Sequence, residues 1–299
     1  MGESGYFCSD CPRRCRAWRS SDQAGGFCGC TALPQVVRAA PHYGEEPCIS
    51  GTKGSGTIFF SGCNLRCVFC QNDEISRAPS GRKVSAEELR DIMLKLKDEG
   101  VHNINLVTPT HYARTAAKAL DGLSLGIPVV WNSSGYESVE TLKRLEGLVQ
   151  IYMPDYKYAD AEAARRFSAA PDYPAAAADA IREMYRQRGS YVMSEDGMLV
   201  SGVLIRHLIL PDMEENSMNV IDFVADSFPP GSVLFSLMSQ YTPMPAAAHY
   251  PELRKRVSAE STELLRHYMK TRKIEAGYWQ DASSATGEMI PDFQEAGLA

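Results

Sequence analysis

The nine cysteines of the chain are crowded into its first quarter, at positions 8, 11, 15, 28, 30, 48, 63, 67 and 70. The odd count and an N-terminus without the apolar stretch of a signal peptide both argue against a disulfide framework. Closely spaced thiols in a reducing compartment indicate metal ligands instead. No cysteine follows Cys70, so metal chemistry is expected to depend on this first part of the chain.

Three of these thiols form one short loop with the spacing Cys63-x3-Cys67-x2-Cys70. Three thiolates so close together can wrap one corner of a cubane cluster and ligate three of its irons. A structural zinc site closes with a fourth ligand, but the nearest following histidine is His102. The loop therefore predicts a [4Fe-4S] cluster whose fourth iron is open, which is what a reaction centre needs.

A second group of thiols comes earlier, with the spacing Cys8-x2-Cys11-x3-Cys15-x12-Cys28. Four thiolates suit either zinc or a second iron-sulfur cluster with a mainly electronic role. The number of ligands slightly favours zinc, and Cys30 could replace one of the four. Chance clustering of small buried thiols is the alternative to a metal site. Cys48 has no evident partner and is expected to be a small buried residue.

From about residue 57 the chain alternates between short apolar runs and amphipathic segments. The strand candidates are Thr57–Ser61, Asn103–Thr108, Ile127–Trp131, Val149–Met153, Val203–Leu210 and Ser232–Met238. Helices are expected at about 85–100, 111–121, 137–146, 174–188, 214–227 and 251–270, with a further helical insertion within 160–174. Capping-box patterns at 85–88 and 134–137 mark two of the helix starts.

Strands joined through helices form parallel sheets by right-handed crossovers. Six such units predict an α/β fold, an open six-stranded parallel (β/α)6 partial TIM barrel, with a doubly wound sheet as the alternative. In either fold the loops at the carboxyl ends of the strands carry the chemistry. Residues 1–56 show little periodicity, so we expect a small Cys-rich, metal-binding N-terminal element there. Residues 57–299 are expected to form the core domain with a C-terminal extension.

The bulk properties exclude some classes of function. With 31 basic and 37 acidic side chains the net charge is -6, which gives no footprint for nucleic acid. No apolar run approaches the roughly 18 residues needed to span a bilayer. No targeting segment is evident either, so the expected location is the cytoplasm.

The segment Ser61-Gly-Cys63-Asn-Leu-Arg-Cys67-Val-Phe-Cys70 closely resembles the cluster loop of the radical S-adenosylmethionine (SAM) superfamily. The resemblance implies that the amino and carboxylate groups of SAM chelate the open iron. It also implies that an electron from the cluster cleaves SAM into methionine and a 5′-deoxyadenosyl radical, which abstracts hydrogen from a substrate. Members carry an aromatic residue before the third cysteine, near the adenine, and Phe69 has this position.

Over most of its length the chain is similar to the activating enzymes of pyruvate formate-lyase, and most of all to their PflX-like branch. The motifs behind this similarity occur in family order: Gly54–Phe60, Asn105–His111, Asn132–Gly135, Tyr152–Lys157, Arg206–Pro211 and Leu237–Tyr241. The similarity implies hydrogen abstraction from a protein or peptide, and a reducing partner such as flavodoxin or ferredoxin. The alternatives are a radical SAM enzyme that acts on a small molecule and a non-catalytic iron-sulfur redox or scaffold protein.

The similarity also implies a SAM site at the ends of successive strands. Asn132 and Ser133 match positions that contact the ribose and the methionine part of SAM. Asp155 and Lys157 match an Asp-x-Lys pair whose lysine can bind the SAM carboxylate. A monovalent cation is expected beside them, held by oxygens of Asn132, Ser133, Asp155 and the Met153 carbonyl.

The loop after the second strand departs from the family pattern. Thr108-Pro-Thr-His111 stands where activases have a Gly-Gly-Glu loop that holds the SAM amino group. An oxygen of Thr108 or Thr110 is therefore expected to take over this contact. His111 alone is typical of a helix start.

The last strands end in four polar or aromatic residues that are expected near the mouth of the barrel, namely Arg206, His207, Gln240 and Tyr241. Strand alternation puts Arg206 and His207 on opposite faces, so only one of them can face the mouth. Near the C-terminus, Trp279-Gln280 either closes the pocket or only covers the barrel.

Overall fold

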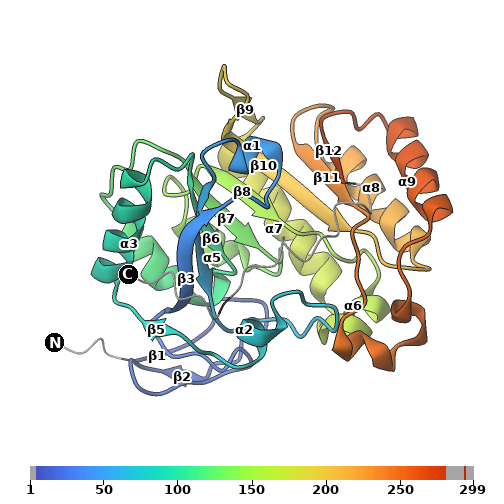
Figure 1. Cartoon of the computed structure of the whole chain (residues 1–299). Helices are drawn as coiled ribbons and strands as arrows, with labels where there is room; N and C mark the ends of the chain where they lie inside the picture. Colours follow the sequence, from blue (N-terminus) through green and yellow to red (C-terminus); the bar gives the residue numbers. More distant parts are fainter. Residues whose placement is uncertain (1–4, 281–292, 294–299) are drawn as a thin grey trace.

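Six parallel strands lie side by side at the centre of the computed structural model, which describes residues 5–280 and 293 (Figure 1). In spatial order they are β4 (Ser55–Phe60), β6 (Ile104–Val107), β7 (Val129–Ser133), β8 (Ile151–Pro154), β10 (Leu199–Leu208) and β11 (Leu234–Met238). Each overlaps one of the six expected strands. The structure thus confirms an α/β fold with a mostly parallel sheet.

The sheet extends beyond these strands at both edges. The strand β12 (Gly277–Gln280) pairs in parallel with β11, so the expected count of six parallel strands is one short. On the other side, β3 (Gln35–His42) pairs antiparallel with β4, and β5 (Arg82–Lys83) pairs with β3. A short strand, β9 (Val192–Met193), pairs with β10. Because β3 belongs to residues 1–56, the sheet crosses the division expected at residue 56, and this division stays a prediction.

The connecting helices lie along the outer side of the sheet (Figure 1). They are α3 (Ala86–Asp98), η1 (Thr110–Tyr112), α4 (Ala113–Leu120), α5 (Val139–Arg144), α6 (Ala161–Ser168), α7 (Tyr173–Arg188), α8 (Glu214–Ser227), η2 (Pro245–His249), η3 (Pro251–Arg254) and α9 (Ala259–Thr271). None of the helices within the described residues is long and apolar enough to cross a membrane.

The two expected capping boxes have different outcomes. Ser85 caps α3 as predicted, since it accepts from the Glu88 N–H while the Glu88 carboxylate accepts from the Ser85 N–H. The box expected over 134–137 is wrong, because Ser138 caps α5 instead. The Glu137 side chain is buried and accepts hydrogen bonds from other parts of the fold.

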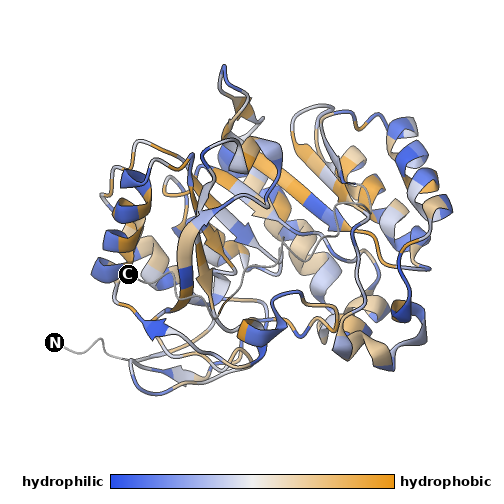
Figure 2. Cartoon of the chain, in the orientation of Figure 1, coloured by the Kyte–Doolittle hydropathy of each residue, from blue (hydrophilic) through white to orange (hydrophobic). Residues whose placement is uncertain are grey.

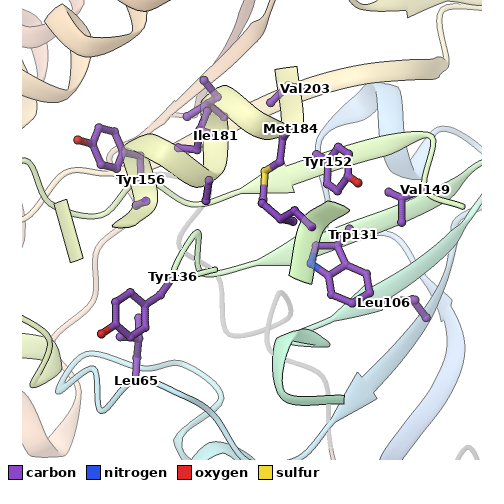
Figure 3. Close-up of a cluster of buried hydrophobic side chains, with 14 of the residues drawn as sticks. Leu65, Leu106, Trp131, Tyr136, Val149, Tyr152, Tyr156, Ile181, Met184 and Val203 are labelled. Carbon is purple, nitrogen blue, oxygen red and sulfur yellow. The ribbon is translucent and has the colours of Figure 1, made fainter. Parts of the chain in front are cut away.

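The outer face of the sheet packs against the helices. Successive side chains of a strand point to opposite sides, and Trp131 and Tyr152 point outward, where they pack with Ile181 and Met184 of α7 (Figure 3). Figure 2 shows hydrophobic strands and mixed helices whose outer surfaces are hydrophilic. Burial of each large apolar side chain stabilises the fold by about 1.5–3 kcal/mol.

The inner face of the sheet is filled by the short helix α1 (Pro47–Ser50). Cys48, as expected, is a small buried residue, and with Ile49 it packs against Ile151, Leu199 and Leu234. These three are the first residues of β8, β10 and β11, so α1 fills the amino-terminal end of the interior. The carboxyl-terminal end is left to the loops that follow the strands, which favours the partial barrel over a doubly wound sheet.

Candidate active site

The loop with Cys63, Cys67 and Cys70 joins β4 to α2 (Asp73–Arg77), at the carboxyl end of the first parallel strand. The Arg66 guanidinium donates to the Cys63 carbonyl at 3.0 Å, which folds the loop back on itself. Gly62 opens the loop with a φ of +80°, and a Cβ there would lie 2.3 Å from the Cys30 sulfur. This close approach fits only glycine and fixes the loop against the N-terminal element.

Each thiol of the loop has at least one hydrogen-bond partner. The Leu65 N–H donates to Cys63 Sγ at 3.4 Å, the Ser168 hydroxyl donates to Cys67 Sγ at 3.0 Å, and Cys70 Sγ lies 3.5 Å from a serine hydroxyl. Burial, and then the neighbouring Cys67 charge, raises the pKa of Cys63 to about 12. Burial also raises the pKa of Cys70. Metal binding therefore has to displace protons from these thiols.

The three thiols open into a cavity of about 250 Å³. The predicted site residues that line it are Phe69, Thr108, Asn132, Ser133, Asp155, Lys157, Arg206 and Gln240. They come from the cluster loop and from the ends of five strands. A single ordered water needs only about 10–15 Å³, so the cavity has room for a small-molecule ligand.

Arg206 is the centre of an ionic network in this cavity. Its Nε donates to Asp155 Oδ1 at 3.0 Å, its Nη1 to Glu45 Oε2 at 2.9 Å, and its Nη2 to Asn132 Oδ1 at 2.7 Å. Lys157 Nζ donates to Asp155 Oδ2 at 2.5 Å. Two cations and two carboxylates thus balance one another in a partly buried setting.

The electrostatics keep this network charged. Burial tends to raise the pKa of Asp155, but the charges of Lys157 and Arg206 outweigh it and lower this pKa. Burial tends to lower the pKa of Lys157, but the Asp155 carboxylate outweighs it and raises this pKa. The predicted monovalent cation stays a prediction, since Asp155 already lies between two cationic side chains.

Sequence reasoning missed Glu45, which lines the same cavity. Its Oε1 accepts from the amides of Asn105 and Asn132, both at 3.0 Å, and its Oε2 accepts from Arg206. In the sequence, the residue lies between β3 and α1, before the first parallel strand begins. The only signal in the sequence was the acidic pair Glu45-Glu46 before Pro47.

Of the two threonines in the loop after β6, only Thr108 lines the cavity. Thr108 lines the cavity with a φ of +58°, which a β-branched residue rarely adopts, and its N–H donates to the Asn132 carbonyl. Thr110 is not among the lining residues, because its hydroxyl donates to Glu137 Oε1 at 2.7 Å in a buried group that includes Trp131. The prediction that placed Thr110 in the site is therefore not supported, and Thr108 is the better candidate.

The ends of the last strands are divided between the cavity and the helices. Arg206 faces the cavity, whereas the His207 ring lies 2.7 Å from the Tyr156 carbonyl and 2.9 Å from the Ser217 hydroxyl. Burial lowers the pKa of His207 to about 4, so it is a neutral structural residue. Gln240 lines the cavity, and its buried Oε1 has no hydrogen-bond partner among the described residues.

Two further aromatic residues lie outside the cavity. The Tyr241 hydroxyl donates to the Leu253 carbonyl, while its ring packs edge-on against Phe69 at 6.2 Å. Trp279 lies at the β12 edge beneath the Arg266 guanidinium. Gln280 is bound to Ser239 through its carbonyl. The pair Trp279-Gln280 thus covers the barrel rather than the pocket.

The N-terminal thiols line a second cavity of about 20 Å³. Its cysteines are Cys8, Cys11, Cys15 and Cys28, the four that were predicted from spacing. Cys30 is not among them, because its Sγ is directed at the Cys28 and Ser61 carbonyls. Among residues 5–280 and 293, no three His, Cys, Asp or Glu side chains are gathered around one ion position.

Comparison with known proteins gives a family and a fold. The model of the radical SAM superfamily matches residues 57–200. An uncharacterized protein of Methanocaldococcus jannaschii, MJ0674, is 30% identical over 266 residues, which cover 86% of this chain and 72% of that protein.

Among solved structures, Streptococcus suis SuiB bound to the precursor peptide SuiA has a TM-score of 0.52 at 14% identity, over 73% of this chain and 46% of SuiB. A second SuiB structure has a TM-score of 0.50 at 13% identity, over 73% of this chain and 47% of SuiB. The chain spans about half the length of SuiB, and at this identity the likeness concerns the fold alone.

Proposed function

Because this chain belongs to the radical SAM superfamily of enzymes, we propose that it cleaves SAM at a [4Fe-4S] cluster held by Cys63, Cys67 and Cys70. When bound, cluster and SAM supply a 5′-deoxyadenosyl radical, which abstracts hydrogen from a substrate. The observation that carries the proposal is the shared cavity, where the three thiols and the strand-end polar residues line one space.

The residues present fit the cluster. The three thiols are close in sequence, line one cavity and each have a hydrogen-bond partner. Sulfur ligands suit iron, and three of them leave one iron open toward the cavity. The remaining strand-end groups are oxygen and nitrogen donors, which suit a polar ligand such as the methionine part of SAM.

Lys157 is the residue that binds the SAM carboxylate in this proposal. Its ammonium group has three donors, and one of them is used by Asp155. Arg206 acts indirectly, because its nitrogens already bind Asp155, Glu45 and Asn132. It therefore positions the Asp155 carboxylate and so orients Lys157.

Two other side chains complete the SAM site. Phe69 is held in place by the rings of Tyr158 and Tyr241, at 6.3 and 6.2 Å. The family resemblance implies that its ring would lie near the adenine of bound SAM. Gln240 offers its unpartnered amide oxygen to a donor of the ligand. Burial leaves this oxygen without solvent, so a ligand N–H that reaches it gains a full hydrogen bond.

The proposed substrate is a protein or peptide, and the proposed reductant is a protein of the flavodoxin or ferredoxin type. The resemblance to the pyruvate formate-lyase activases supports a polypeptide substrate. The structure of SuiB holds a precursor peptide, which supports a substrate of this class. A small-molecule substrate is the alternative outcome of the experiment below.

The experiment uses the full chain, reconstituted with iron and sulfide without oxygen. With dithionite and SAM it is expected to form 5′-deoxyadenosine, and the matched variant Cys48→Ala is expected to do the same. The Cys63→Ala/Cys67→Ala/Cys70→Ala variant is expected to form none. Unchanged 5′-deoxyadenosine formation by this variant would overturn the proposal, and stimulation of cleavage by candidate peptides or by metabolites identifies the substrate class.

A further inference from the structure

We propose that Cys8, Cys11, Cys15 and Cys28 hold a second iron-sulfur cluster, which relays electrons from an external protein to the cluster loop. The relay rests on the proposed function, but the metal site does not. The first observation is the cavity itself, whose lining includes all four thiols. The thiols come from the hairpin of β1 (Tyr6–Phe7) and β2 (Trp18–Arg19) and from the loop that follows it.

The hairpin carries backbone strain on both sides of Cys15. Arg14 has a φ of +43° and Arg16 a φ of +50°, and side chains other than glycine rarely adopt such values. A left-handed residue costs roughly 1–2 kcal/mol. Such strain persists where the surrounding structure has to aim a particular group, here the Cys15 thiol.

A buried cation lies beside the thiols. Arg19 is fully buried, and its guanidinium donates to the Thr31 and His111 carbonyls and to Cys8 Sγ at 3.4 Å. No carboxylate forms an ion pair with it within residues 5–280. Buried charges are normally paired, and thiols that bind metal as thiolates would supply the negative charge that balances Arg19.

A buried ring nitrogen points to the same conclusion. His111 lines the cavity, and its Nε2 lies 2.8 Å from the Ser61 carbonyl. Since a carbonyl accepts, Nε2 carries the proton and Nδ1 keeps its lone pair. This Nδ1 is buried and has no partner among the described residues. An unpartnered buried lone pair beside this cavity indicates that the site is incomplete without a bound group, which the four thiols hold.

The arrangement favours a cluster over a single zinc ion. Zinc has no redox chemistry, whereas an iron-sulfur cluster can take up and pass on an electron. The N-terminal cavity adjoins the cluster loop through Asn64, so an electron carrier has a use at this position that a zinc ion lacks. Phe27 N–H also donates to Cys15 Sγ at 3.4 Å, which resembles the Leu65 contact to Cys63.

The two thiol sites are neighbours. Asn64 directly follows Cys63 in the chain, and it also lines the N-terminal cavity. Arg13 donates to the Asn64 carbonyl at 2.9 Å and stacks on Phe27, and Arg66 donates to the Phe27 carbonyl at 2.5 Å. The cluster loop and the N-terminal cavity are therefore in direct contact.

This arrangement suits electron transfer in one direction. Cys15 is exposed, whereas the thiols of the cluster loop lie in the SAM cavity. A one-electron donor of the flavodoxin or ferredoxin type reduces the N-terminal cluster by one electron. That electron then passes to the cluster at Cys63, so the first centre is oxidised as the second is reduced, and no atom or proton has to move.

The metal content of the full chain tests the site. After anaerobic reconstitution, the wild type is expected to hold about eight irons per chain and the Cys63→Ala/Cys67→Ala/Cys70→Ala variant about four. Cys11→Ala/Cys15→Ala is expected to hold about four, and the matched control Cys48→Ala about eight. Circular dichroism checks that the variants fold. One zinc in place of the second cluster, or no metal at the N-terminal thiols, overturns the proposal.

Electron paramagnetic resonance of the loop cluster tests the relay independently of SAM cleavage. In Cys11→Ala/Cys15→Ala, the rate of its reduction by flavodoxin relative to the rate with dithionite is expected to fall at least about tenfold. An unchanged ratio overturns the relay. If the wild type holds eight irons but forms no 5′-deoxyadenosine, the proposed function fails while the second site stands.

Discussion

The two thiol-lined cavities differ in what surrounds the sulfur atoms. The cavity at Cys63 measures about 250 Å³ and contains two balanced pairs of opposite charges. The cavity at Cys11 measures about 20 Å³ and adjoins a buried cation that no carboxylate balances within the described residues. Room and balanced charge allow a ligand to enter, whereas a cavity of this small size can hold metal but no substrate. In the two proposals above, cysteines thus hold a reaction centre in one place and an electron carrier in the other.

The supports of the two cavities differ as well. The larger one lies at the ends of parallel strands, where the backbone is fixed by the sheet. The smaller one is attached to helices α4 and α5 through Asp10. The Asp10 carboxylate is almost fully buried and accepts from Arg114 at 2.9 Å and from Arg144 at 3.0 Å. The two arginine side chains are about 40% exposed, so solvent weakens each pair. The Asp10 carboxylate itself is buried and would be left unpaired without them, so they still stabilise the attachment.

The largest effect is expected from a change in the cluster loop, and this change tests whether the two cavities are separate sites. Cys67→Ala should lower 5′-deoxyadenosine formation by at least about a thousandfold, because an iron without its thiolate leaves the cluster incomplete. Iron analysis should still find the N-terminal centre. If the N-terminal iron were lost together with the loop iron, the two cavities would not be separate sites.

Lys157→Ala is expected to have the next largest effect, and only on the large cavity. A charged hydrogen bond contributes roughly 1.5–3 kcal/mol, so SAM affinity should weaken by about 10- to 100-fold. Calorimetric titration and iron analysis on one sample separate ligand binding from cluster content, and the exposed Lys143→Ala on α5 is the control. Unchanged SAM affinity in both Lys157→Ala and Asp155→Ala would mean that SAM is held elsewhere.

Glu45→Gln tests whether the balanced charges of the large cavity matter for SAM binding, because it removes one charge and keeps the side-chain shape. Arg206 would lose one of its two charged partners and keep Asp155, while Asn105 and Asn132 could still donate to the amide oxygen. SAM affinity should fall by a few-fold, about 1 kcal/mol, through a less well oriented Asp155. Glu88→Gln, on the exposed start of α3, should leave SAM affinity unaltered.

The smallest effect concerns the pH dependence of stability. The pKa of His207 is lowered by burial to about 4, below its value in an unfolded chain. Below about pH 6.5 the His207 side chain is protonated in the unfolded chain but stays neutral in the folded chain. The free energy of unfolding therefore falls between about pH 6.5 and 4, with a slope of up to about 1.4 kcal/mol per pH unit. His207→Gln should reduce this slope in urea titrations at pH 5 and 7. An identical slope in wild type and variant would show that His207 does not titrate as described.

The parallel strands could be predicted from the sequence because each is a short apolar run between turn residues. The strand β3 could not, since Gln35–His42 contains Pro41 and alternates poorly. The strand β12 was missed for a similar reason, because Gly277–Gln280 is short and opens with a glycine.

The candidate site was predicted where strand order alone determines position. Asn132, Asp155, Lys157 and Arg206 follow from the rule that strand ends share one rim of the barrel. Thr110 was misplaced because the positive φ of Thr108 turns the chain after β6, which residue types do not reveal. Glu45 was missed because it reaches the site through tertiary packing.

The position of α1 has a consequence for the order in which the molecule can assemble. Cys48 and Ile49 are made early in synthesis, but they pack against residues as late as Leu234. The Glu45 carboxylate likewise cannot form its ion pair with Arg206 until that later residue has been synthesised. Contacts over such long sequence separations slow folding, because the chain must close large loops before it gains their energy. The segment from Glu45 to Ile49 should therefore remain loosely packed on the ribosome until the last parallel strands emerge.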